Sequence, residues 1–255
     1  GHTFRSQSDT EVVLRLFILK GPAFLHDLNG FFALAIHDAE KDALFLARDR
    51  FGVKPLHWAQ ADGRFLFASE LRALLALGAH RDQDRTSLRQ IITQYYIPAP
   101  EGVFTGTRRL LPGHALTVDP SGVTEERWYD VLEASARLKP PSDPNKTLFR
   151  LMDDAVRLRL IADVPVGACL SGGVDSSIVS ALATRHHKHL HTFSIGYADD
   201  PFFDETRHAE EVSRHIGSEH STFKLTREEL AENYVRLLNA LDEPFADSSA
   251  IPSFI

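Results

Sequence analysis

The 255-residue sequence has few of the features that mark secreted, membrane-bound or nucleic-acid-binding proteins. It contains one cysteine, Cys169, so no disulfide can form within the chain, which suits a reducing compartment. No apolar run approaches the roughly 18 residues that cross a bilayer, and no charged-then-apolar leader opens the chain. The net charge of −7 leaves no general basic surface for nucleic acid. These absences predict a cytoplasmic protein with no membrane or nucleic-acid partner.

The composition is that of a folded globular protein, with 43% hydrophobic and 25% charged residues. After a helix predicted near residues 11–20, the first half is rich in short strand candidates separated by turn-forming residues. Short connections between successive strands favour antiparallel pairing. The sequence therefore predicts an α+β domain built on antiparallel sheets. Its strand candidates are Phe31–His37, Ala43–Arg48, Leu56–Ala59, Arg64–Ala68 and His114–Val118.

The pattern changes after a proline-rich stretch at residues 136–146, because proline disfavours both helix and strand. Beyond it, strand and helix patterns alternate. Such alternation predicts an α/β domain with a parallel, doubly wound sheet, whose ligands bind beyond the carboxyl ends of the strands. The expected organisation is a first domain at 1–135, a linker at 136–146 and a second domain at 147–255.

The loop at residues 171–177, with the sequence SGGVDSS, follows a predicted buried strand and precedes a predicted helix. Its glycines allow the backbone to turn sharply and bring N–H groups to a ligand, and a helix N-terminus attracts anions. Its serines add hydroxyl donors, and its aspartate adds a carboxylate suited to Mg²⁺. The alternative is a tight turn whose side chains merely cap the helix. We favour a site for the pyrophosphate part of a nucleotide, formed by Ser171, Gly172, Gly173, Asp175 and Ser176.

The loop is not of the Walker type, because no G-x-x-x-x-G-K-S/T pattern occurs in the sequence. It resembles the PP-loop of ATP pyrophosphatases, which cut ATP between the α and β phosphates. Other segments extend this likeness, in one order, along nearly the whole chain. Together they resemble the glutamine-dependent asparagine synthetases. The segments are Phe4–Glu11, Leu28–Ala35, Ala47–Leu56, Phe67–Leu71, Leu111–His114, Arg127–Tyr129, Asp163–Ser177, Thr192–Gly196 and Asp242–Ser249.

The resemblance implies part of an N-terminal-nucleophile glutaminase domain, followed by part of an ATP pyrophosphatase domain. The parent enzyme is then expected to make asparagine from aspartate, glutamine and ATP. It would use Mg²⁺ and a β-aspartyl-AMP intermediate, and would release AMP, pyrophosphate and glutamate. Its partners would be these small molecules, and a homodimer is one assembly that the resemblance allows.

Individual residues take their expected roles from the same resemblance. Asp9 matches the aspartate that holds the α-amino group of glutamine, although Ser8–Glu11 also has the pattern of a capping box. Leu170 and Ile195, with Gly196 beside them, match positions whose backbone contacts the adenine of ATP. The strand pattern alone would make Leu170 and Ile195 ordinary core residues. Asp175 is expected to bind the Mg²⁺ that accompanies pyrophosphate.

The chain departs from the family where the chemistry of glutamine hydrolysis would begin. The family nucleophile is an N-terminal cysteine, whereas this chain begins with Gly1, so no catalytic residue is assigned. We therefore expect a fragment, truncated at both ends and inactive alone. Three alternatives stay open for the parent: a relative that amidates another carboxylate, a ring-closing enzyme like a β-lactam synthetase, and a non-catalytic nucleotide-binding homologue.

Other polar residues have a structural as well as a functional interpretation. Arg48, Asp49 and Lys54 lie in a family segment, but a salt-bridged turn between two strands explains them better. Asp242–Glu243 and Asp247–Ser248 either lie near the acceptor pocket or form a helix end and a following cap. Cys169 is expected to be an inert core residue, because it lies in the middle of a predicted strand.

Overall fold

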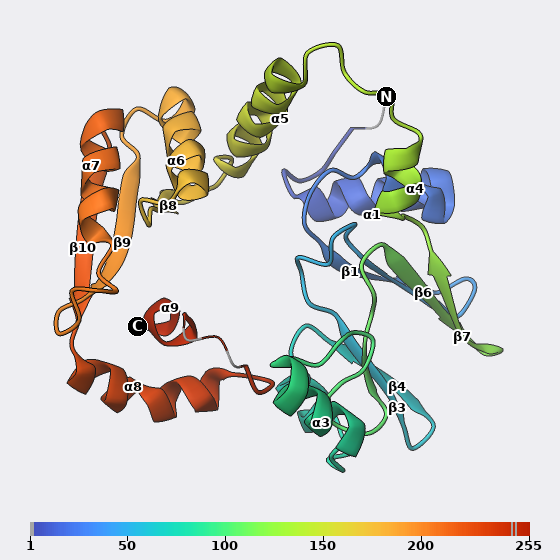
Figure 1. Cartoon of the computed structure of the whole chain (residues 1–255). Coiled ribbons are helices and arrows are strands. Elements are labelled where there is room, and N and C mark those ends of the chain that lie inside the picture. Colours follow the sequence, from blue (N-terminus) through green and yellow to red (C-terminus); the bar gives the residue numbers. More distant parts are fainter. Residues whose placement is uncertain (1–2, 246, 248) are drawn as a thin grey trace. The chain divides into compact units, whose positions relative to one another are not determined.

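The computed structural model describes residues 3–245, 247 and 249–255, and the chain forms two compact units (Figure 1). The first unit contains residues 1–138 and 241–246, and the second contains residues 139–240 and 247–255. A short segment that follows the last long helix of the second unit thus belongs to the first unit.

Two antiparallel sheets form the frame of the first unit. One has the strand order β1-β2-β6-β7 and the other has the order β4-β3-β5. The first helix of this unit is capped by Ser8, whose hydroxyl accepts a hydrogen bond from the N–H of Thr10. The elements are α1 (Asp9–Lys20), the 3-10 helix η1 (Gly21–Asp27), β1 (Ala33–Asp38), β2 (Ala43–Arg48), β3 (His57–Ala61), β4 (Arg64–Ala68), α2 (Leu71–Ala76), α3 (Arg85–Gln94), β5 (Thr107–Arg109), β6 (His114–Asp119), β7 (Gly122–Arg127) and α4 (Val131–Ala136).

Alternation along β2 links the layers of the first unit, since successive side chains of a strand point to opposite faces. Phe45 and Ala47 pack with residues of η1 and α1, including Phe24 and Phe17. Leu46 faces the other way and packs in a cluster with Trp58 of β3, together with Leu56, Leu110 and Leu116. The core of this unit therefore lies on both sides of the four-stranded sheet.

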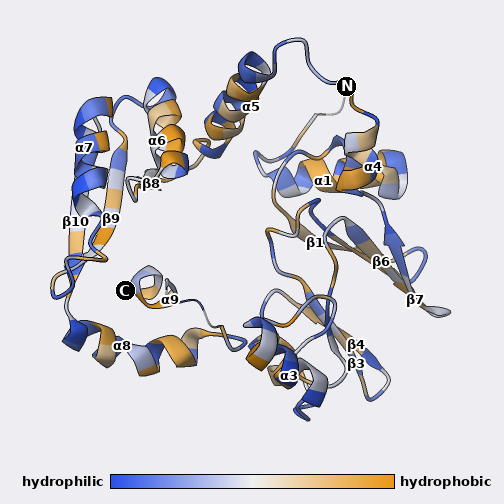
Figure 2. Ribbon diagram, viewed as in Figure 1, coloured by the Kyte–Doolittle hydropathy of each residue, from blue (hydrophilic) through white to orange (hydrophobic). Residues whose placement is uncertain are grey.

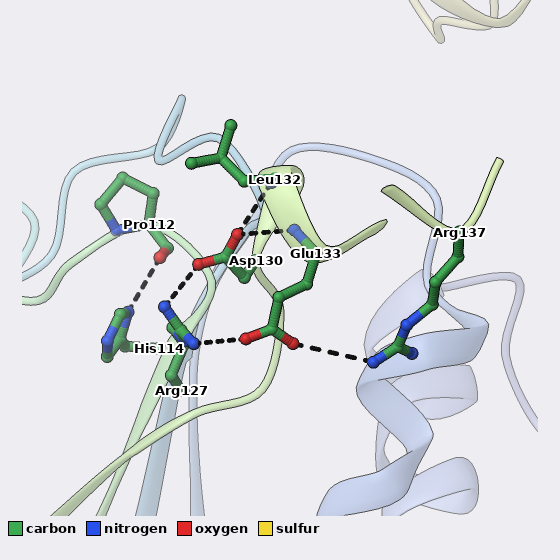
Figure 3. Close-up of polar contacts among 7 residues, drawn as sticks. All are labelled: Pro112, His114, Arg127, Asp130, Leu132, Glu133 and Arg137. Carbon is green, nitrogen blue, oxygen red and sulfur yellow. Dashed lines mark hydrogen bonds and ion pairs between the residues drawn. The ribbon is translucent and has the colours of Figure 1, made fainter. Parts of the chain in front are cut away.

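A polar network joins the end of β7 to α4 (Figure 3). Asp130 accepts hydrogen bonds from the N–H groups of Leu132 and Glu133 and so caps α4. Arg127 pairs with both Asp130 and Glu133, and Arg137 lies 3.7 Å from Glu133. The network fixes the end of the four-stranded sheet against the short helix that follows it.

A parallel sheet with the strand order β10-β9-β8 forms the second unit. Helix α6 connects β8 to β9 and α7 connects β9 to β10, while α5 packs on α6 through Val156 and Leu182. The elements are α5 (Pro144–Arg159), β8 (Gly167–Cys169), α6 (Val174–His186), β9 (His191–Tyr197), α7 (Thr206–Ile216), β10 (Glu219–Leu225), α8 (Arg227–Ala240) and α9 (Ala250–Phe254).

The two faces of this parallel sheet are unlike. Thr192 and Ser194 are buried on the face toward α7, where His220 bonds to both hydroxyls at 2.9 and 3.0 Å. Phe193 and Ile195 point to the opposite face and are 38% and 42% exposed. Figure 2 accordingly shows orange segments along β9 and β10, whereas α7 is mostly blue. The apolar residues of β9 thus face away from the connecting helices.

These observations confirm the predicted change from antiparallel to parallel sheets. The strand order runs in one direction through β8, β9 and β10, so the reversal that defines a doubly wound sheet is not among the described strands. The sequence analysis did not predict β7, because five of its six residues are exposed and its sequence does not alternate between apolar and polar residues. It also missed η1, β5, α4 and α9, which are short.

Candidate nucleotide site

The loop at residues 171–177 leaves β8 and enters α6, as predicted. Its polar groups bond mainly to one another: the hydroxyls of Ser171 and Ser176 lie 3.0 Å apart, and Ser177 donates to the carbonyl of Gly173 at 2.6 Å. Gly173 is the N-cap residue of α6 and provides no side chain to cap it. The first-turn N–H groups of a helix have no acceptor within the helix, so those of α6 remain for a ligand.

Gly172 is required by both backbone conformation and space. Its φ of +82° is one that side chains rarely adopt. A Cβ there would lie 2.5 Å from the Cβ of His208 and 2.7 Å from the backbone nitrogen of Ala209. The first turns of α7 therefore press directly on the loop, and only glycine fits between them.

Gly196, at the carboxyl end of β9, is enclosed by the start of the same helix. A Cβ there would overlap Asp204 Oδ1 and lie 2.5 Å from Thr206 Cγ2. Asp204 accepts hydrogen bonds from the N–H and hydroxyl of Thr206 and pairs with Lys224 at 2.8 Å. The Lys224 ammonium and the Thr206 hydroxyl hold the pKa of Asp204 below its ordinary value. Asp204 thus ties α7 to the end of β10, beside the candidate site.

A cavity of about 540 Å³ lies beside the loop. Leu170, Ser171 and Ile195 line it, so the structure brings together three of the residues predicted to contact ATP. Leu170 is buried, whereas Ile195 is 42% exposed and is not a core residue in the described chain. The other lining residues are Cys169, Phe193, Ser194, Tyr197, Phe223, Leu225, Ser249, Pro252, Ser253 and Ile255.

Asp175 lies in the first turn of α6, and its side chain points to solvent. No partner for its carboxylate is found among the described residues, which also contain no group of three acidic, histidine or cysteine side chains suited to a metal. A carboxylate without a partner, next to free helix N–H groups and to hydroxyls bonded only within the loop, fits a Mg²⁺ that takes its remaining ligands from phosphate oxygens and water. Asp175 and the loop serines would hold the metal and the phosphates.

Comparison with known families accounts for both units. Residues 1–129 match the family described as glutamine amidotransferase domain, and residues 147–255 match asparagine synthase. The glutamine-hydrolyzing asparagine synthetases 3 and 1 of Bacillus subtilis are 34% and 31% identical to this chain, over 96% and 100% of it. The chain belongs to the glutamine-hydrolysing asparagine synthetase family.

The chain spans about two fifths of the length of these relatives, namely 42% and 40%. A relative with a different name, amidase chyE of Penicillium rubens, is 30% identical over 91% of this chain and 37% of its own length. No helix in the described part of the chain is long and apolar enough to span a membrane.

Asp9, predicted to hold the α-amino group of glutamine, lies in the first unit and is exposed at the start of α1. Its neighbours cap the helix: Ser8 bonds to Thr10, and Glu11 accepts from the N–H groups of Arg5 and Ser6. Glu11 does not reach back to Ser8, so the capping box is incomplete. The Asp9 carboxylate contacts only the hydroxyl of Thr10, at 3.5 Å, among the described residues.

Two expectations about other residues need correction. Cys169 is exposed, because it lies on the same uncovered face of the sheet as Phe193, so it is a cavity residue and not a core residue. Asp49 and Arg48 form no ion pair with each other or with Lys54 within the described residues; both bond to backbone groups of the turn.

The acidic pair Asp242–Glu243 belongs to the first unit, not to the nucleotide cavity. Asp242 accepts from the N–H of Leu71 and pairs with Arg72, and Glu243 pairs with Arg109. The pair therefore lies beyond the end of α8 and makes its described contacts within the first unit, and its place near the acceptor pocket stays a prediction. Of the second pair, Asp247 accepts from the N–H of Ser249, while Ser248 lies outside the described residues.

Sequence reasoning also missed residues that build the site from other elements. Asp204 and Thr206 enclose Gly196, and Phe193, Phe223 and Tyr197 line the cavity. The alternation of β9 is the signal that could have found Phe193 and Tyr197, because they share a face with Ile195.

Proposed function

We propose that the protein containing this chain makes asparagine from aspartate, glutamine and ATP. The observation that carries the proposal is the 171–177 loop, which borders a cavity through Ser171 and whose side-chain polar groups have no described partner outside the loop. The names of the relatives add the reaction class. In the proposed domain organisation, residues 1–135 form part of the amidotransferase domain, 136–146 form the linker and 147–255 form part of the ATP-using domain.

The proposed chemistry uses two displacements. The β-carboxylate oxygen of aspartate attacks the α-phosphorus of ATP, and the bond to the bridging oxygen breaks with pyrophosphate as the leaving group. Ammonia from glutamine then attacks the acyl carbon of β-aspartyl-AMP, loses a proton and expels AMP. Adenylation replaces a poor leaving group, and exclusion of water protects the intermediate from hydrolysis.

Each predicted residue has a role in this proposal. Ser171, Ser176 and the N–H groups around Gly172 and Gly173 hold pyrophosphate oxygens, and Asp175 holds Mg²⁺. A bound Mg²⁺ neutralises charge that develops on the leaving pyrophosphate. Leu170, Ile195 and Gly196 form the wall against adenine.

The remaining parts of the proposal concern glutamine and the setting of the enzyme. Asp9 binds the ammonium group of glutamine, since a carboxylate without a cationic partner is suited to that role. The protein works in the cytoplasm on small molecules and forms a homodimer.

Nucleotide binding by the 255-residue chain tests the metal role of Asp175. Binding of pyrophosphate and ATP is measured calorimetrically with and without Mg²⁺. Asp175→Asn is expected to weaken Mg²⁺-dependent binding about tenfold or more, the usual scale when a metal site is disturbed. Asp154→Asn is the matched control, because Asp154 is an exposed acid of the same unit that pairs only locally with Arg157. Equal Mg²⁺-dependent affinity of Asp175→Asn and wild type would remove Asp175 from the site.

The whole protein tests the reaction. With aspartate, glutamine and ATP, it is expected to form AMP, pyrophosphate and asparagine in equal amounts. If AMP forms only with another carboxylic acid, the acceptor in the proposal is wrong. If no carboxylic acid gives AMP while ATP still binds, the synthetase reaction itself is wrong.

A further inference from the structure

Strand β9 carries a buried polar layer on its face toward α7. Ser194 and Thr192 are 6% and 0% exposed, and His220 of the neighbouring strand β10 lies opposite Thr192 in the register. The imidazole Nδ1 of His220 lies 2.9 Å from the hydroxyl of Thr192, and its Nε2 lies 3.0 Å from the hydroxyl of Ser194. One ring of β10 therefore holds β9 at two successive positions of this face.

Hydrogen bonds extend this layer from β9 to α7. The hydroxyl of Thr192 lies 2.9 Å from that of Ser218, which lies 2.8 Å from the hydroxyl of Ser213 in α7. Ser213 in turn donates to the carbonyl of Ser218 at 3.2 Å. A buried polar network in which every member has a partner favours one arrangement of the elements that it joins. The network around His220 thus fixes β9 relative to both β10 and α7.

The residue after Ser194 is Ile195, whose backbone groups face the end of β8. The carbonyl of Phe193 accepts a hydrogen bond from the N–H of Leu170 at 2.7 Å. Because residues two apart in a strand turn their backbone groups to the same side, the N–H and carbonyl of Ile195 face that side too. Strand β8 ends at Cys169, and no bond from the Ile195 N–H to the Leu170 carbonyl is among the described backbone contacts. These groups are open to a ligand in the cavity that Leu170 and Ile195 line.

We propose that His220 is a positioning residue for the adenine part of the nucleotide, because through Ser194 it fixes the place of the Ile195 backbone at the cavity. The inference rests on the proposed function, since it needs ATP to bind there. The pyrophosphate part is held separately by the loop at residues 171–177, whose described side-chain bonds lie within the loop. His220 therefore acts on the affinity for adenine and not on the affinity for pyrophosphate.

Two variants at position 220 separate the two bonds of the ring. The amide of asparagine reaches the place of Nδ1, beside Thr192, whereas the longer glutamine places its amide near Nε2, beside Ser194. His220→Asn removes the nearer partner of the buried Ser194 hydroxyl, so Mg-ATP binding is expected to weaken about tenfold, the scale of one lost buried hydrogen bond. Its affinity for pyrophosphate is expected to stay that of wild type. His220→Gln is expected to bind ATP nearly as wild type does. Calorimetry on the 255-residue chain measures both ligands.

The matched control is His191→Asn. His191 begins β9 at its other end, where its ring is 51% exposed and lies 3.4 Å from the carboxylate of Glu219. This variant is expected to bind both ligands as wild type does. Unchanged ATP affinity in His220→Asn, an equal loss in His220→Gln, or a parallel loss of pyrophosphate affinity would overturn the positioning role alone. A wild-type chain that binds neither ligand would overturn the proposed nucleotide site as well.

Nitrogen NMR of the wild-type imidazole tests the same role if the variants do not fold. The signal of Nε2, the ring atom beside Ser194, is expected to shift when Mg-ATP binds and to stay in place when pyrophosphate binds alone. Amide signals of residues 171–177 report separately whether each ligand is bound. If ATP binds and the Nε2 signal of His220 does not move, His220 does not position the adenine part.

Discussion

The loop at residues 48–54 in the first unit and the loop at residues 171–177 in the second satisfy their polar groups in opposite ways. Asp49 is 1% exposed, and its carboxylate accepts hydrogen bonds from four backbone N–H groups. The guanidinium of Arg48 donates to three backbone carbonyls of the same region. In contrast, Asp175 is exposed and has no partner among the described residues.

This difference separates a loop that holds the fold from a loop suited to bind a ligand. Burial alone would raise the pKa of Asp49, but its four N–H donors hold it below its ordinary value, so the charge belongs to the folded state. In the 48–54 loop, the side chains of Arg48 and Asp49 are thus taken up by backbone groups. The 171–177 loop keeps a carboxylate and helix N–H groups free, although both loops carry residues typical of the family.

The largest expected effect on stability comes from removing the Asp49 carboxylate, which accepts the hydrogen bonds of the 48–54 loop. Asp49→Ala leaves four partly buried N–H groups without their acceptor, and we expect a loss of about 4 kcal/mol in the free energy of unfolding. Urea unfolding followed by tryptophan fluorescence measures it, because Trp58 and Trp128 both lie in the first unit.

Asp27→Ala provides the control for this measurement. Asp27 belongs to the same unit and pairs with Lys20 at 2.8 Å, but the two side chains are 43% and 49% exposed. We expect a loss of about 0.5 kcal/mol, as for other surface pairs. A similar small loss for Asp49→Ala would show that the closed network does not hold the loop.

The second prediction tests whether the loop at residues 171–177 is also loosely packed. Its carboxylate and helix N–H groups have no described partner, but Gly172 leaves no room for a side chain next to His208 and Ala209. Gly172→Ala combines an unfavourable φ with overpacking, and we expect the second unit to lose about 3 kcal/mol. The measurement is hydrogen exchange of amides in α6 and α7.

Gly217→Ala separates the two causes, because Gly217 has a φ of +70° and nothing within 4 Å of its Cβ position. Only the backbone cost of about 1 kcal/mol is expected there. If both variants lose the same free energy, the contact between α7 and the loop is not as close as described.

These loops also show what the sequence could reveal. The SGGVDSS pattern identified the second loop because glycines, hydroxyls and an aspartate occur together before a helix. The closed state of the first loop could not be predicted, because the acceptors of Arg48 include Leu110, which is 62 residues away. The order of strands and helices followed from local patterns, whereas β7 and the anchor of Asp242 on α2 depend on tertiary contacts that no local pattern contains.

The smallest expected effect concerns His57, a buried histidine of the first unit. His57 is 7% exposed, and its Nδ1 has no hydrogen-bond partner in the described structure. Burial lowers its pKa from 6.5 to about 4, and the charges of Arg109 and Arg48 add to this while Asp242 opposes it. The unfolded chain therefore binds a proton between pH 6.5 and 4 that the folded chain does not.

It follows that the stability contributed by neutral His57 is complete above pH 6.5 and is lost as the pH falls toward 4. Between pH 7 and 5 we expect a loss of about 2 kcal/mol in the free energy of unfolding. Glu243 acts in the opposite direction, since its raised pKa favours the folded state at low pH. His57→Gln, which cannot titrate, should remove the loss between pH 7 and 5 in the tryptophan-monitored urea experiment. His114→Gln, at a more exposed site in the same unit, should retain it. If the pH dependence in His57→Gln is the same as in wild type, the first unit does not keep His57 neutral.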